Sequence, residues 1–183
     1  MTPRCWNLLI YRVPAQPSTK RVYVWRKLKS WGALYLQQSV CILPSEEELQ
    51  PKLEALKADI LAEEGEADLL TIWIHTPEQN AILVQRFQQQ ADEEYHEFLG
   101  RCGDLHHELN KERELGKLIF AELEENEAEL TKLRSWLPKI HQRNWFKSPK
   151  SLQADQAFKE CELDFQLFSQ QVYEAHGINL NDQ

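Results

Sequence analysis

The first 76 residues alternate between short apolar runs and longer segments with helical spacing. The apolar run Trp6–Val13 predicts a strand, and a further run predicts a strand over Ala67–His75. Between them, the alternation over residues 33–44 predicts either one long bent strand or two short strands with a turn at Gln38-Ser39.

Two helices are predicted between these strands. In Thr19–Trp31, spacings of three place Val22, Trp25 and Leu28 on one face, which we expect to be buried. The second helix is predicted over Ser45–Glu64, because its serine and Glu48 fit a capping box. Its expected core positions are Leu49, Leu53, Leu56, Ile60 and Leu61. The order of strands and helices predicts an α/β sandwich with both helices on one face of the sheet.

From residue 77 onward the apolar positions recur in steps of four and three, which predicts helices that pack side by side. Breaks near Gly116 and over residues 144–151 would let three helices fold back into an antiparallel bundle. The three series are Phe87, Ala91, Tyr95, Phe98, Cys102, Leu105, Leu109; Ile119, Leu123, Asn126, Leu130, Leu133, Leu137, Ile140; and Ala154, Phe158, Cys161, Phe165, Phe168, Val172, Ala175. We therefore predict an α+β protein with an α/β domain at residues 1–76 and a helical bundle at residues 77–183. Asn126 would fix the helix register if it is buried; the alternative is that it faces solvent.

Charge is separated along the chain, which has a formal net charge of -8. Residues 1–44 carry seven Lys or Arg and no acid, and residues 130–154 carry six Lys or Arg and no acid. Two positive segments in an acidic chain indicate a polyanion or oxyanion partner, or else neutralisation of the protein's own acidic helices. We expect a cytoplasmic protein, because the start lacks a secretory signal and no apolar run is long enough to span a bilayer.

The two positive segments supply the candidate binding residues for DNA or an oxyanion. The guanidinium of Arg143 suits a tetrahedral oxyanion, because it can donate two parallel hydrogen bonds. Trp136, Trp145 and Phe146 lie among the cations of the second segment, where they could stack on bases or close the end of the bundle. The seven candidates are Lys20, Arg21, Arg26, Lys27, Lys29, Arg143 and Lys147.

Few residues point to catalysis. No phosphate-binding loop, dinucleotide fingerprint, nucleophile elbow or H-E-x-x-H motif is present, so we expect neither enzymatic activity nor a cofactor. Cys102 and His106 have the spacing of metal ligands on a helix, but Cys102 falls on an apolar series, and we predict no metal site. The four cysteines are widely spaced and are expected to be reduced and packed inside.

Three quoted segments resemble a known family. "LLIYRVPAQPSTKRVYVWRKLKSWGALYLQQSVCILP", "GKLIFAELEENEAELTKLRSW" and "RNWFKSP" are similar to the N-terminal domain of ChrB-type chromate-resistance proteins, from Trp6 to about Phe168. The first segment also resembles the ferredoxin-like core of phenylacetate-type repressors and of small CRISPR-adaptation nucleases. Those nucleases carry a metal-binding Asp where this chain has Tyr11-Arg12-Val13, which argues against metal-dependent cleavage.

The resemblance implies a protein of chromate-resistance operons with a ferredoxin-like first domain. Full-length members are chromate-responsive regulators that bind promoter DNA and continue into a C-terminal domain, so we expect a stand-alone N-terminal-type protein. Asn144 stands where many members have Asp, and the role of that acid is not transferred. We predict a non-enzymatic regulator or sensor domain, homodimeric or bound to a protein partner, whose cations bind DNA or chromate or sulfate. The alternative is an interaction or scaffold module that pairs with a separately encoded C-terminal-type protein; neither function involves a membrane.

Overall fold

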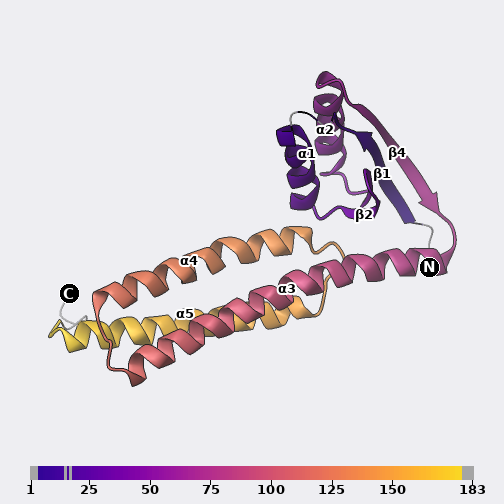
Figure 1. Cartoon of the computed structure of the whole chain (residues 1–183). Coiled ribbons are helices and arrows are strands. Elements are labelled where there is room, and N and C mark those ends of the chain that lie inside the picture. The colour runs from indigo at the N-terminus through magenta and orange to yellow at the C-terminus, as the bar shows by residue number, and fades with distance from the viewer. Residues whose placement is uncertain (1–3, 15, 17, 179–183) are drawn as a thin grey trace. The chain divides into compact units, whose positions relative to one another are not determined.

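The computed structural model describes residues 4–14, 16 and 18–178, and it divides into two compact units (Figure 1). The first unit contains the chain up to Gln90 together with Gln142–Phe146. The second contains Ala91–His141 and the chain from Lys147 onward. The expected domain division after residue 76 stays a prediction.

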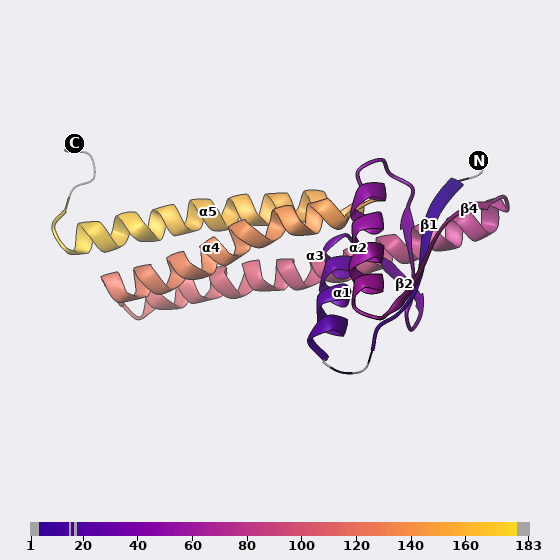
Figure 2. The same ribbon diagram turned by 90° about the horizontal axis from the view of Figure 1, so that it is seen from above.

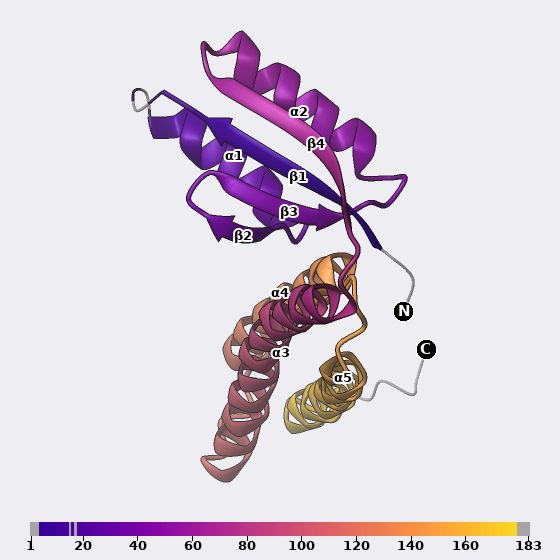
Figure 3. The ribbon, with the colours of Figure 1, turned by 90° about the vertical axis from the view of Figure 1, so that its right-hand side faces the viewer.

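The first unit is a four-stranded sheet with two helices on one of its faces (Figure 3). The strands are antiparallel and lie in the order β2-β3-β1-β4, so each strand-helix-strand unit has another strand inserted between its two strands. This is the ferredoxin-like arrangement, and the predicted α+β class is confirmed. Its elements are β1 (Arg4–Arg12), α1 (Ser18–Ser30), β2 (Leu34–Gln37), β3 (Val40–Pro44), α2 (Gln50–Ala62) and β4 (Glu66–Ile74).

The region predicted as one bent strand or two short ones forms a hairpin of two strands. The turn falls at Gln38 and Ser39, and Ser39 has a left-handed φ of 62°. The register of β2 against β3 shifts between Tyr35 and Gln37, which gives this short edge strand a local irregularity.

The predicted inner face of the first helix is wrong in two of its three residues. Leu28 is buried, but its buried companion is Val24, while Val22 is 39% exposed and Trp25 is 47% exposed. Residues three apart and residues four apart both share a face of a helix. The sequence alone therefore allows Leu28 to share the buried face either with Trp25 or with Val24. Packing on the sheet selects the narrow face of Val24 and Leu28 and leaves Trp25 outside.

The predicted start of the second helix is also wrong. The helix α2 begins at Gln50, and its N-cap Leu49 makes no side-chain capping bond, so Ser45 forms no capping box. The reason is Pro51, which has no N–H to donate and is tolerated only in the first turn of a helix. The inner positions Leu49, Leu53, Leu56 and Ile60 are confirmed as buried, whereas Leu61 is half exposed.

On the other face of the sheet, residues that follow β4 in the sequence pack around Trp6. Its indole is fully buried, stacks on Phe87 at 5.6 Å between ring centroids, and lies 5.8 Å from the ring of Phe146. The indole Nε1 donates a hydrogen bond of 3.0 Å to Asn80 Oδ1. Residues well beyond β4 therefore complete the core of the first unit.

The second unit is built from three helices that run side by side (Figure 2). They are the part of α3 (Pro77–Glu114) beyond residue 90, α4 (Phe120–Arg143) and α5 (Lys150–Ala175), so the predicted breaks between helices are confirmed. Most predicted core positions are buried, but Ile119 and Ala175 are exposed. Asn126 is buried, and its amide donates to the carbonyl oxygen of Glu122, so the solvent-facing alternative is wrong. Among the described residues, no helix combines the length and apolar character required to span a membrane.

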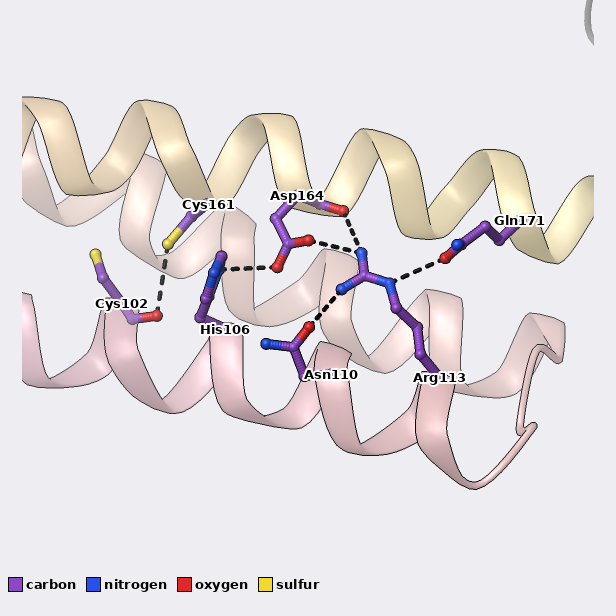
Figure 4. Close-up of polar contacts among 7 residues, drawn as sticks. All are labelled: Cys102, His106, Asn110, Arg113, Cys161, Asp164 and Gln171. Atoms are coloured by element: carbon purple, nitrogen blue, oxygen red, sulfur yellow. Dashed lines mark hydrogen bonds and ion pairs between the residues drawn. The ribbon is translucent and has the colours of Figure 1, made fainter.

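A polar cluster joins α3 to α5 inside this unit (Figure 4). Arg113 donates to the carboxylate of Asp164 at 2.6 Å and to the backbone oxygen of the same residue at 2.9 Å. It also donates to Asn110 and Gln171, and His106 Nδ1 lies 2.8 Å from the second oxygen of Asp164. The side chains of Arg113 and Asp164 are only 20% and 12% exposed, so this ion pair is shielded from water.

Replacing Arg113 by alanine should lower the free energy of unfolding by about 2 kcal/mol, because it leaves the Asp164 carboxylate mostly buried without its principal donor. The matched control is Lys132→Ala, whose exposed ion pair with Glu129 should contribute little. Urea unfolding followed by circular dichroism measures both. Equal losses in the two variants would contradict a special role for the Arg113 cluster.

Candidate polyanion-binding surface

The basic residues predicted on the first helix lie on the outside of α1. Arg21, Arg26, Lys27 and Lys29 are exposed, and the ion pairs between described residues join none of the four to a carboxylate. Lys20 differs, because it forms an ion pair with Glu63 of α2. Four of the five predicted cations of this helix are therefore available to an external anion.

Helical spacing arranges these cations around exposed rings. Arg21, Trp25 and Lys29 are four residues apart and form one row along α1, with Val22 and Arg26 in the neighbouring row. The Lys29 Nζ lies 5.2 Å from the ring centre of Trp25. A surface of alternating guanidinium, indole and ammonium groups suits phosphates together with sugars or bases. We call Arg21, Val22, Trp25, Arg26 and Lys29 the α1 surface.

The other side of α1 has a different character. An open cleft of about 550 Å³ lies there between α1 and α2. Its charged lining residues are Lys20, Asp59 and Glu63, and Tyr23 donates to the Asp59 carboxylate at 2.8 Å. This bond and the nearby carboxylate raise the pKa of Tyr23. Two acids against one paired lysine make this cleft unsuitable for an anion, so Lys20 does not belong to the α1 surface. Lys27 lies toward this side, 5.7 Å from the ring of Tyr23.

The structure brings one cation of the second positive segment, Arg143, to the end of α1. The backbone oxygen and Cβ of Arg143 lie 3.0 Å from where a Cβ on Gly32 would stand. Close by, Trp145 Nε1 donates to the carbonyl oxygen of Trp31 at 2.8 Å. Arg143 is half-buried and takes part in further interactions, so its guanidinium is less available than the α1 cations.

The remaining cations of the second segment belong to the second unit, and some of them are already paired within it. Lys147 is exposed but belongs to the second unit, and Arg134 forms an ion pair with Glu162 within that unit. Part of this segment therefore neutralises the bundle's own acids, as one of the two alternatives predicted.

The described residues contain no group of three or more His, Cys, Asp or Glu side chains that could hold a metal ion. His106 pairs with Asp164, while Cys102 is buried in the core beside Cys161 (Figure 4). The Cys161 thiol donates a weak hydrogen bond of 3.5 Å to the backbone oxygen of Cys102, and the adjacent Cys161 thiol together with burial raises the pKa of Cys102. All four cysteines are free thiols, and Cys41, whose pKa burial raises to about 12, is one of three that are buried.

Trp25, which the sequence pattern assigns to the core, is instead exposed among the cations of α1. A signal was present, because Trp25 is followed directly by Arg26 and Lys27 and lies four residues from both Arg21 and Lys29. An aromatic residue surrounded by cations on helical spacing is more typical of an exposed binding surface than of a core.

Fold and surface together define a class: a ferredoxin-like domain that presents a basic helix and is followed by a helical bundle. Residues 21–178 match the family model described as "Protein ChrB, N-terminal", and the chain belongs to this family. It is 30% identical over 87 residues, 48% of its length, to Protein ChrB of Cupriavidus metallidurans. The matched part spans 27% of that relative's own length.

Gly32 ties the end of α1 to residues 143–145, and its substitution tests this contact. Gly32 has a φ of +71°, and an added Cβ would meet Arg143 and Trp145 at 3.0–3.1 Å. Gly32→Ala should lower the free energy of unfolding by at least about 1 kcal/mol more than Gly116→Ala, because the added Cβ overpacks this contact. The control glycine has a similar φ of +66° but no atom within 4 Å of the added Cβ. Thermal unfolding of both variants measures the difference, and equal losses would contradict a packed Gly32.

Proposed function

We propose that this protein is a non-enzymatic regulator associated with chromate resistance, and that its α1 surface binds the phosphate backbone of DNA. Membership of the ChrB family supports the association with chromate resistance. The observation that carries DNA binding is the exposed row of cations on α1, none of which has a carboxylate partner among the described ion pairs.

The geometry of α1 favours an extended polyanion over a small oxyanion. A chromate or sulfate ion is held best where several donors converge on one point from different elements. Arg21, Arg26 and Lys29 instead spread along the outside of a single helix, over about 12 Å at 1.5 Å per residue. This distribution fits several phosphates in succession, and Trp25 can pack against the nucleic acid between them.

The electrostatics of the helix support the same function. The last turn of α1 carries Lys27 and Lys29, which interact favourably with the negative end of the helix dipole. Basic residues at this end of the helix therefore do not destabilise the fold, although they remain exposed to solvent. The chain as a whole is acidic, so its attraction for DNA must be local to this helix.

The test is a titration of DNA from upstream of the protein's own gene with increasing salt. Each neutralised phosphate contributes about -0.9 to the slope of log K against log salt concentration. The triple variant Arg21→Ala, Arg26→Ala, Lys29→Ala should bind at least tenfold more weakly and lose between about two and three from that slope.

The matched control is Lys52→Ala, Lys111→Ala, Lys132→Ala, which changes the net charge equally but removes lysines that already pair with acids. Fluorescence anisotropy measures the affinity of each form. A slope near zero for the unmodified chain, or equal losses in the two triple variants, would refute DNA binding by the α1 surface.

A further inference from the structure

The helix α5 carries a second, exposed stripe with three leucines that the bundle does not use. Its buried residues are on one side, chiefly Ala154, Cys161, Phe168 and Val172. On the opposite side lie seven exposed residues that follow one another in steps of four and three. At 100° per residue, these seven positions span an arc of 80° around the helix axis. They are Leu152, Gln156, Lys159, Leu163, Leu167, Gln170 and Glu174.

The leucines of this outer stripe are unusually exposed. Leu152, Leu163 and Leu167 are 75%, 61% and 59% exposed, and just beyond the helix Ile178 is exposed as well. The other four members contribute one positive and one negative charge, so the stripe itself is neutral on an acidic chain. A neutral row of leucines on a charged surface indicates a contact with another protein surface.

We propose that this stripe pairs with the same stripe of a second copy of the chain, antiparallel, with the two-fold axis between Leu163 and Leu167. The inference does not depend on DNA binding by α1. The register follows from the stripe's own symmetry, since this axis places Leu163 of each copy against Leu167 of the other. Leu152 comes opposite the end of α5 in the second copy, just beyond which Ile178 is exposed.

The polar residues fit the same register. Gln156 faces Glu174 of the second copy, an amide against a carboxylate, and the symmetry repeats the pair. Lys159 and Glu174 of opposite copies come within one helical turn of each other, about 4.5 Å along the axis, and can form an ion pair. In this arrangement no two like charges of the stripe face each other directly. A parallel arrangement in register would instead set Lys159 against Lys159 and Glu174 against Glu174.

A groove beside the stripe offers space for the second copy. It has a volume of about 510 Å³ between α4 and α5, and its apolar lining consists of Leu130, Leu163 and Phe165. The ion pair of Arg134 and Glu162 lies among its other lining residues. Because Leu163 borders the groove, Leu167 of the second copy would be placed to pack into it, as a knob packs into a hole. The contact is one helix pair, so we expect a dimer that dissociates in the micromolar range.

Sedimentation equilibrium of the full chain tests the pairing. The average mass should rise from 21.6 kDa toward about twice that value between roughly 1 and 200 µM. Leu163→Glu with Leu167→Glu should keep the chain monomeric throughout this range. The matched control is Ile82→Glu with Leu115→Glu, which adds the same charge at equally exposed positions off the stripe and should dimerise normally. Circular dichroism confirms that each variant is folded.

Spin-label distances test the direction of pairing in the same samples. With Cys5 replaced by serine, labels at Gln166→Cys would lie close to their symmetry mates, whereas labels at Gln153→Cys would be separated by about 36 Å along the helix axis. Short distances at both positions would mean parallel pairing and would overturn the proposal. So would a chain that stays monomeric at 200 µM, or one whose stripe leucines bind a different, separately encoded protein instead.

Discussion

The α/β unit depends on the burial of Trp6, because two helices can cover only one face of its sheet. On the other face, the indole needs both apolar neighbours and a hydrogen-bond acceptor for its N–H. Phe87 and Asn80, both on α3, supply these, and Phe146 adds a third ring. Arg4 lies 4.5 Å from the ring centre of Phe146 and extends the cluster toward solvent. A sheet with one face packed on helices would otherwise expose this large apolar surface, so the unit needs residues from after β4.

This requirement explains why the α1 surface is ordered yet exposed. The segment that brings Phe146 to the sheet also brings Trp145 to the carbonyl of Trp31 and the backbone of Arg143 to Gly32, which fixes the end of α1. Only Val24 and Leu28 of this helix are buried. The remaining side chains therefore extend from a helix whose position is set by backbone contacts and two core residues, and four of its cations need no partner for the fold.

The sequence predicted what depends on local spacing. The three helices of the bundle follow from apolar steps of four and three, which must face a partner helix wherever they occur. The order of strands and helices along the chain was equally readable, whereas the pattern over residues 33–44 left one bent strand and a hairpin as alternatives. The buried face of α1 could not be predicted from spacing. Leu28 lies three residues from Trp25 and four from Val24, and only packing on the sheet selects Val24. Pro51 could have corrected the start of α2. The approach of Trp145 to Trp31 joins residues 114 positions apart, and no local pattern encodes it.

The outer stripe of α5 is a second feature that the main apolar spacing does not reveal. The main apolar series of α5 is its inner face, and Leu152, Leu163 and Leu167 lie off that series. They are eleven and four residues apart, which returns a helix to nearly the same angle, so they form a series of their own. A helix in a folded chain normally needs one apolar face, because its opposite face meets water. When the opposite face also carries leucines, their burial lowers the free energy as well, and within this chain Leu152, Leu163 and Leu167 remain exposed. The hydrophobic effect that folds the bundle thus also favours association through α5.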